Sequence, residues 1–192
     1  MPYPAQTNRE QIIATAWELI ERDGAADLSL ATVAAALGIR APSLYRHVAS
    51  KEALLAGVNA LTWQQLAEAY RAALDDGVQP AEQLGRVCQA HRRFAHAHPH
   101  TYILALTTAE RESQAEPSAL EQFVAPIDAI MVELVGHERA LPLLRGAFAL
   151  VHGFAMLELR AQLRRPGNLD VAFDAVVAAY LDGCAASVVP AS

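Results

Sequence analysis

A short basic stretch near the N-terminus carries the clearest chemistry in this sequence. No acidic residue lies between Asp27 and Glu52, although the chain as a whole has a formal net charge of −6. Side chains in that interval that can bond to phosphates or to base edges include Arg40, Ser43, Tyr45, Arg46, His47 and Lys51. This local charge predicts a contact with nucleic acid, which the overall acidity alone would argue against.

Histidines form the second group of polar side chains. They are His91, His96, His98 and His100, with Cys88 nearby. Metal ligands on one helix need a spacing of three or four residues, which Cys88 and His91 satisfy. His96 would point away from His91, however, and Pro99 would end the helix before the last histidine. The spacing therefore favours core histidines, or a polar anchor in a ligand pocket, over a metal site.

No arrangement of catalytic residues is found in the sequence. It has no glycine-rich phosphate loop, no serine in a nucleophile turn and no carboxylate pair on an apolar face. We therefore expect neither an enzyme nor a bound cofactor. The two cysteines, Cys88 and Cys184, are predicted to be small buried hydrophobic residues.

The composition indicates a folded chain that associates with itself. Of the 192 residues, 53% are hydrophobic and 19% are charged, which excludes intrinsic disorder. This apolar fraction exceeds what one small monomer readily buries. No uninterrupted run of about 18 apolar residues occurs, so we expect no membrane span. The N-terminus lacks the pattern of a signal peptide, and a cytoplasmic location is expected.

The hydrophobic periodicity predicts an all-α fold, because apolar residues recur at spacings of three and four. Three short helices are expected first. A capping box starting at Thr7 opens the first helix, and Gly24 ends it. The second runs from Ser29 to Gly38, and the third covers residues 41–48.

Helix, glycine-bearing turn and helix together form the layout of a helix-turn-helix, whose second helix enters the major groove of DNA. Gly38 permits the turn, while Leu44 and Val48 are predicted to be core residues. The Tyr45 hydroxyl is expected to contact a phosphate. Lys51 begins the next helix, where the helix dipole also favours a phosphate.

Further helices are expected over about 51–75, 80–98, 102–106 and 118–135, with the polar segment 107–118 as a loop. The last two helices differ in kind. No charged residue occurs between Arg145 and Glu158, so the helix there must be buried on two sides. The final helix follows Asn168 and groups its apolar residues on one side. We expect this pair to pack on its own domain and on a second copy of the chain.

Residues 8–55 resemble the TetR-type bacterial transcriptional regulators. The resemblance rests on the sequences ERDGAADLS, TVAAALGI and PSLYRHVASKEALL. Two later stretches, HRRFAHAHPHTY and FALVHGFAMLEL, resemble one branch of the ligand-binding domains of that family. That branch commonly has a tryptophan four residues before a histidine-glycine pair, where this chain has Phe148.

The resemblance implies an N-terminal helix-turn-helix domain over residues 1–53 and a helical ligand-binding and dimerisation domain over 54–192. It further implies a homodimer, typically a repressor, that binds a palindromic double-stranded operator and is released by a small apolar or aromatic effector. The dimer would form through the last two helices. The expected DNA-binding residues are Ser29, Arg40, Ala41, Pro42, Ser43, Tyr45, Arg46, His47 and Lys51.

The effector pocket is expected among apolar and aromatic residues of the second domain, with few polar anchors. They are Trp63, Leu66, His91, Phe94, Tyr102, Phe123, Ile127, Met131, Phe148 and Met156, with residues 107–118 as a gate. Two alternatives remain at this stage. One is a histidine-rich metal-binding sensor or enzyme without DNA binding, and the other is a ligand-buffering protein that has lost DNA binding.

Overall fold

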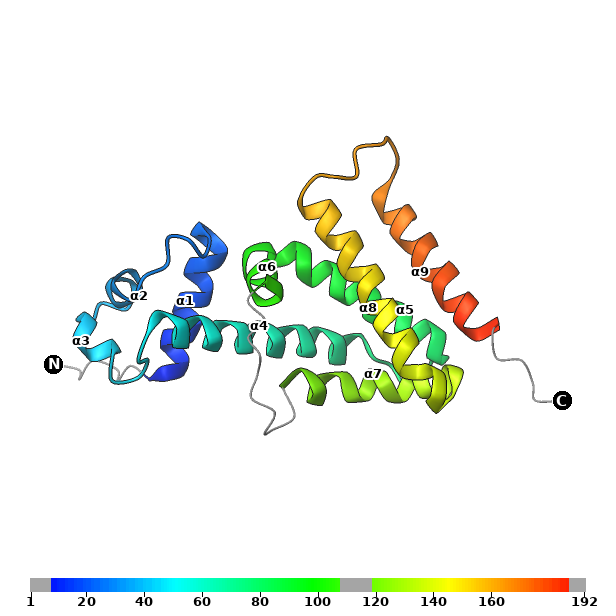
Figure 1. Cartoon of the computed structure of the whole chain (residues 1–192), viewed down its shortest axis with the longest axis horizontal. Helices are drawn as coiled ribbons and strands as arrows, with labels where there is room; N and C mark the ends of the chain where they lie inside the picture. The colour runs from blue at the N-terminus through cyan, green and yellow to red at the C-terminus, as the bar shows by residue number, and fades with distance from the viewer. Residues whose placement is uncertain (1–7, 108–118, 187–192) are drawn as a thin grey trace. The chain divides into compact units, whose positions relative to one another are not determined.

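The computed structural model describes residues 8–107 and 119–186, without the side chains of 119–123. All regular elements in these ranges are α-helices, as predicted (Figure 1). The helices are α1 (Arg9–Asp23), α2 (Leu30–Ala36), α3 (Ala41–Leu44), α4 (Lys51–Ala73), α5 (Pro80–Ala97), α6 (Pro99–Thr107), α7 (Ala119–Val135), α8 (His137–Leu159) and α9 (Leu169–Ala186). The predicted gate beyond Thr107 and the predicted cap at Ser118 lie outside the described residues.

The chain divides into two compact units. The first comprises residues 1–65 and 98–116, and the second comprises residues 66–97 and 117–192. Helix α4 therefore contributes its first part to one unit and its last part to the other. A division by packing does not establish which residues bind DNA, so the functional boundary between residues 53 and 54 stays a prediction.

The first helix begins one residue later than the predicted capping box. Asn8 Oδ1 accepts a hydrogen bond from the Gln11 amide at 2.8 Å, and Gln11 Oε1 accepts one from the Asn8 amide at 3.3 Å. The reciprocal pair forms because the Gln11 side chain is long enough to reach back to the cap. The helix ends at Gly24, whose φ of 87° lies in the region that favours glycine, as the sequence predicted.

Helix α3 is shorter than predicted and ends at Leu44 rather than Val48. The His47 amide donates to the Leu44 carbonyl at 2.9 Å, which is a tighter bond than the helical i to i+4 pattern. The Val48 amide donates to the same carbonyl at 3.0 Å, which holds the start of the following turn against α3. Leu44 and Val48 are both buried, which confirms their predicted place in the core.

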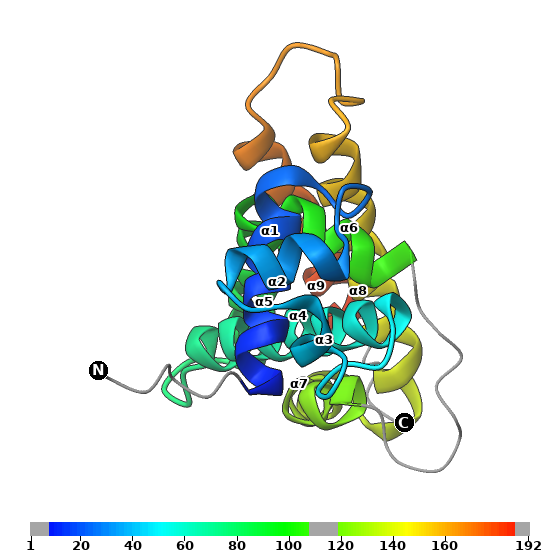
Figure 2. The same cartoon turned by 90° about the vertical axis from the view of Figure 1, so that its left-hand side faces the viewer.

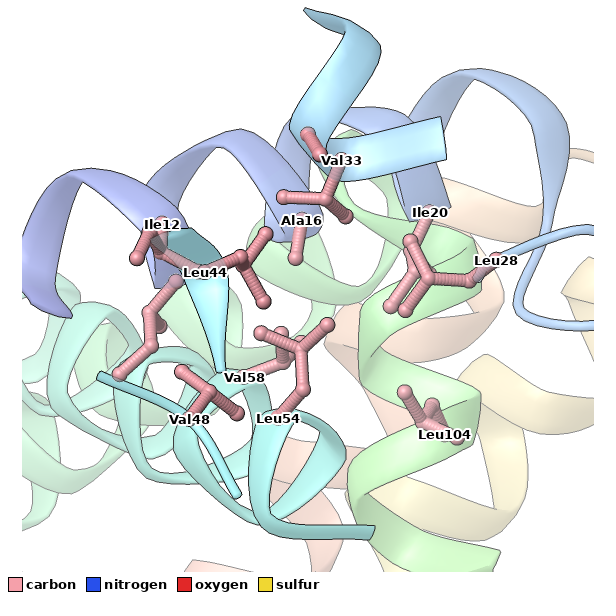
Figure 3. Packing of buried hydrophobic residues seen from close by; sticks show 12 residues of the cluster. Ile12, Ala16, Ile20, Leu28, Val33, Leu44, Val48, Leu54, Val58 and Leu104 are labelled. Carbon is pink, nitrogen blue, oxygen red and sulfur yellow. The ribbon is translucent and has the colours of Figure 1, made fainter. Parts of the chain in front are cut away.

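The core of the first unit draws on more than the three predicted helices. Figure 3 shows buried side chains of α1, α2, α3 and α4 gathered with Leu104 of α6. Helix α6 begins at Pro99, three residues before the predicted start, because proline is well suited to a first helical position.

Helix α6 is held against α1 by hydrogen bonds to Glu21. The Thr101 amide and hydroxyl both donate to Glu21 Oε1 at 2.6 Å. The Glu21 carboxylate therefore caps the positive end of α6. His100 Nδ1 also lies 2.9 Å from the Glu21 carbonyl oxygen. Because of these contacts, α6 is an integral part of the first unit.

In the second unit, α5 packs against α7, α8 and α9. Helices α8 and α9 run antiparallel and are joined by residues 160–168 (Figures 1 and 2). Tyr180 of α9 packs against Gly146 of α8, and its hydroxyl donates to the Leu143 carbonyl at 2.6 Å. A Cβ at Gly146 would overlap that hydroxyl oxygen and lie 3.1 Å from Tyr180 Cζ.

Gly146→Ala is expected to destabilise the protein by about 1–3 kcal/mol through overpacking. This reverses the usual gain of up to about 1 kcal/mol when alanine replaces a glycine inside a helix. Tyr180→Phe removes the overlapping oxygen, so the alanine should cost less in that background. Urea unfolding of the single and double variants measures this coupling. Gly85→Ala in α5 is the control, because its Cβ meets only Leu181 Cδ1 at 3.9 Å. Additive free energies for the pair would contradict the packing described.

One side of α8 faces the interior, and another side is open within a single chain. Ala147, Val151 and Ala155 are buried, whereas Phe148 is 40% exposed and Leu157 is 39% exposed. By length and composition, this helix is also apolar enough to cross a membrane. That property is weak evidence of a span, because a helix packed between two protein layers has the same composition.

Candidate functional site

The second and third helices form the predicted helix-turn-helix, and both are labelled in Figure 2. Gly38 has a φ of 66°, and the Ile39 amide beyond it donates to the Ala34 carbonyl at 3.0 Å. This closes the turn after α2 and directs the chain into α3. Glycine is favoured at this position because other residues are strained at such a φ.

Most of the predicted DNA-contacting side chains are exposed on and around α3. They are Arg40, Pro42, Ser43, Tyr45, Arg46 and His47. Among the described residues of the first unit, Tyr45 is the one large apolar side chain left exposed, at 56%. Burial of Leu44 and Val48 fixes the helix in place, while the residues around them present hydrogen-bonding groups to solvent.

The start of α4 places a positive charge at the positive end of the helix dipole. Lys51 is its first residue, and Ser50 Oγ accepts a hydrogen bond from the Ala53 amide at 3.2 Å. A hydrogen bond to Ser50 also lowers the pKa of Glu52. An anion approaching this end meets Lys51 and the positive end of the helix dipole.

Two predicted DNA contacts also have structural roles. Ser29 caps α2, and its Oγ accepts a hydrogen bond from the Thr32 amide at 3.1 Å. Ala41 is half-buried against the core of the first unit. Their contacts with DNA stay predictions.

A cluster of four rings joins three helices of the second unit. Tyr70 Oη of α4 lies 2.5 Å from His91 Nδ1 of α5. The His91 ring meets the edge of the Phe148 ring of α8 at 5.6 Å between centroids. Phe148 in turn stacks on His152, one helical turn further along α8, at 5.9 Å. The cluster thus combines a hydroxyl and two imidazoles with an aromatic surface, as small-molecule sites commonly do.

Burial keeps the two imidazoles of this cluster uncharged. His91 is 3% exposed, and this burial, together with the nearby His152, lowers its pKa to about 3. Burial also lowers the pKa of His152. Both imidazoles are therefore neutral at physiological pH and act as hydrogen-bonding groups rather than cations.

Seven residues of the predicted effector set belong to the second unit, and the His91 and Phe148 rings among them are in contact. Leu66, His91, Phe94, Ile127, Met131, Phe148 and Met156 belong to the second unit. Trp63 and Tyr102 belong to the first unit, and the side chain of Phe123 lies outside the described residues. The predicted set did not include Tyr70, nor did it include His152, for which the sequence favoured helix packing over ligand binding. Tyr70 lies four residues after Leu66, and His152 four after Phe148, so helical spacing could have found both.

An open groove in the second unit lies away from this predicted set. It has a volume of about 670 Å³ and is formed by the end of α4, by α5 and by α9. Arg86, Arg93, Asp174 and Asp182 are among its lining residues, and none of the predicted effector residues lines it.

The four histidines of the central stretch have different partners. His91 contacts Tyr70, and His96 lies 3.0 Å from Glu158. The His98 ring centroid lies 4.9 Å from that of Trp17, and His100 contacts Glu21. Within residues 8–107 and 119–186, no group of three or more His, Cys, Asp or Glu side chains could hold a metal ion. Burial raises the pKa of the Cys88 thiol to about 12, which also disfavours a thiolate ligand.

Comparisons with known proteins match both parts of the chain. The family model described as bacterial regulatory proteins, tetR family, matches residues 12–58. The model described as tetracyclin repressor-like, C-terminal domain, matches residues 84–180. The uncharacterized HTH-type transcriptional regulator Rv0681 of Mycobacterium tuberculosis is 29% identical over 164 residues, covering 81% of this chain and 72% of that protein.

Solved structures support the fold. The transcriptional regulator SCO7222, a TetR from Streptomyces coelicolor, aligns with a TM-score of 0.77 at 16% identity, covering 96% of this chain and all of that one. A TetR variant from Acinetobacter baumannii AYE in complex with minocycline aligns at 0.70 with 17% identity, covering 92% and 96%. At these identities the likeness concerns the fold. The two family models span the helix-turn-helix and most of the second unit, and the chain belongs to the TetR family of DNA-binding bacterial transcriptional regulators.

Proposed function

We propose that this regulator is a homodimeric repressor that acts in the cytoplasm on a palindromic operator. The dimer forms through α8 and α9. A small apolar or aromatic effector binds in the second domain and releases the operator. Residues 1–53 bind the DNA, and residues 54–192 bind the effector and form the dimer.

The single observation that carries this proposal is the distribution of exposed large apolar residues. Among the described residues they are Tyr45, Leu141, Phe148, Leu157, Val171 and Val176. Apart from Tyr45, which lies beside α3, all are on α8 and α9. Exposed large apolar residues concentrated on two neighbouring helices are typical of an interface between proteins. A second copy would cover the same face on both chains by two-fold symmetry.

Two glycines on these helices support a close contact with a second copy. A Cβ added at Gly153 of α8 or at Gly183 of α9 would meet no atom within 4 Å in a single chain. Helical glycines cost stability of about 0.5–1 kcal/mol each relative to alanine. A glycine without a side chain allows the backbone of a partner helix to approach closely, which would account for glycine at these two positions.

On DNA, the exposed side chains divide into two roles. Tyr45, His47 and Lys51 are assigned to phosphates, because they have a hydroxyl, an imidazole and a charge beside a helix terminus. Arg40 and Arg46 are assigned to base edges, since an arginine binds guanine with two hydrogen bonds. Ala41 and Pro42 would lie against the bases, and Ser29 and Ser43 would contribute further contacts.

Lys51→Ala is expected to weaken binding to all DNA sequences and to reduce the slope of log affinity against log salt by about 1. Arg40→Ala should instead relax the preference at particular base pairs, by about 1–3 kcal/mol. Titrations of both variants against an operator selected from random DNA, and against point variants of that operator, measure these effects. The wild-type chain is the reference for both. If Lys51→Ala changed base preference and Arg40→Ala changed only the salt slope, the assignment of Lys51 to phosphates and of Arg40 to base edges would be wrong.

The effector part of the proposal is supported by the ring cluster around His91. Neutral hydrogen-bonding groups beside the half-exposed Phe148 suit an apolar or aromatic molecule with a hydroxyl or similar group. The TetR variant of Acinetobacter baumannii that shares this fold is in complex with a small molecule, minocycline. By linkage, an effector that weakens operator binding must itself bind less tightly to the protein–operator complex.

A further inference from the structure

Arg92, in the middle of α5, joins the end of α8 to the start of α9. Its Nε donates to Glu158 Oε2 at 2.8 Å, and its Nη2 donates to Glu158 Oε1 at 2.6 Å. The same Nη2 lies 2.8 Å from Asp170 Oδ1. Glu158 is in the last turn of α8, and Asp170 is in the first turn of α9. One guanidinium therefore holds both ends of the 160–168 connection.

Aromatic rings surround the same guanidinium. Its carbon lies 4.9 Å from the centroid of Phe173 and 5.8 Å from that of Phe154. These two rings, one from each helix, meet edge to face at 5.2 Å. The guanidinium is thus fixed in orientation as well as in position, because it pairs with a carboxylate through two bonds and contacts rings on two helices.

The carboxylate of Glu158 depends on this arginine. Its side chain is 4% exposed and lies at the negative end of the helix dipole, where a carboxylate is disfavoured. Burial alone would raise the pKa of Glu158, but hydrogen bonds from Arg92 and His96 hold it below its ordinary value. Removal of the arginine would leave a buried charge that keeps its contact with His96, 3.0 Å away, but loses both bonds from the guanidinium.

The Arg92 contacts fix the angle between the two helices at one end of the pair. At the other end, the Tyr180 hydroxyl binds the Leu143 carbonyl. Two antiparallel helices tied at both ends keep one crossing angle. The same two helices carry the exposed apolar surface assigned above to the dimer.

We propose that Arg92 is a positioning residue that sets which spacing of operator half-sites the dimer accepts. The proposal rests on the proposed dimer through α8 and α9. In a two-fold dimer, the angle between the interface helices sets the relation between the two protomers, and each protomer carries one DNA-binding unit. A change in that angle therefore changes the separation and phase of the two recognition helices. Arg92 acts through α8 and α9, on which its partners Glu158, Asp170, Phe154 and Phe173 lie.

The test uses the full-length protein and an operator selected from random DNA, together with operators that carry two base pairs more or fewer between the half-sites. Each such change rotates one half-site by about 70° relative to the other. Wild-type protein should bind the altered operators much more weakly. The measured quantity is the affinity for the selected operator divided by the affinity for an altered one. In Arg92→Met this ratio should shrink by about tenfold, because the contacts that hold one helix angle are lost.

Two further variants separate this role from a general loss of charge or stability. Arg93→Met is the matched control, since Arg93 is the next residue of α5 and is exposed. It should keep the wild-type ratio. Arg92→Lys should fall between wild type and Arg92→Met, because lysine restores the charge without the planar pair of bonds.

An unchanged ratio in folded Arg92→Met would overturn the inference. If that variant does not fold, Glu158→Gln replaces it, and an unchanged ratio there would overturn the inference equally. A wild-type protein that is monomeric, or that has no spacing preference, would instead overturn the proposed dimer function. Sedimentation of each variant shows which of the two has failed.

Discussion

Val176→Arg is expected to produce a monomer that binds the selected operator about 10² to 10⁴ times more weakly than wild type. Val176 is 41% exposed on α9, on the apolar surface assigned to the dimer. An arginine there would bury an unpaired charge in each half of a symmetric interface, which is costly. Loss of the dimer also removes the second half-site contact, so affinity falls although no DNA-contacting residue has changed.

Ala178→Arg provides the control for this substitution. Ala178 lies two residues further along α9, on the side of the helix that lines the open groove, and it is exposed. The same charge at that position should leave the dimer and operator binding intact. Sedimentation velocity at micromolar concentration and operator titration measure both properties. A Val176→Arg protein that remains a dimer with wild-type affinity would show that α9 is not in the interface.

Much of the fold could be predicted from the sequence because its signals are local. Ser29, Gly24 and Gly38 mark helix ends through capping and φ, and these marks need no tertiary information. The extent of α3 could not be predicted in this way. Its last turn is reshaped because Val48 must reach a core that distant residues build.

The position of α6 could not be predicted from the sequence either, because it also depends on contacts with distant residues. Thr101 and Leu104 join the first unit through contacts with Glu21 and the core near α1, about eighty positions earlier in the chain. Periodicity within one helix gives its buried face but not the partner that covers it. For this reason, the predicted division of the chain into residues 1–53 and 54–192 could not show that α6 packs with the first unit.

The candidate sites show the same contrast. The DNA-contacting side chains are close in sequence, so a local motif located them together. The ring cluster joins Tyr70, His91 and Phe148 from three helices, and its members are recognisable as a group only after packing is known. Arg92 had no sequence signal that distinguished it from Arg93, although one is tied to Glu158 and the other is exposed.

Acid is expected to destabilise the second unit through His91. The pKa of this histidine is about 3 in the folded protein and about 6.5 when unfolded, so below pH 6.5 the unfolded state binds more protons. The free energy of unfolding is therefore highest above pH 6.5 and falls by up to about 1.4 kcal/mol per pH unit as the pH decreases toward 3. Over the whole interval, the loss from this one group is roughly 4–5 kcal/mol.

His91→Gln removes the titrating group while keeping a hydrogen-bonding side chain next to Tyr70. Urea unfolding between pH 7.5 and pH 5 should show a shallower loss of stability in this variant than in wild type, whatever its stability at pH 7.5. The interval stops at pH 5 because, at lower pH, protonation of carboxylates with lowered pKa values, such as Asp75 and Glu158, also destabilises the protein. His137→Gln is the control, since His137 is exposed at the start of α8 and its loss should leave the slope unchanged. Parallel curves for wild type and His91→Gln would mean that His91 is not held neutral by burial, and the hydrogen-bonding role assigned to it in the effector site would fail with that result.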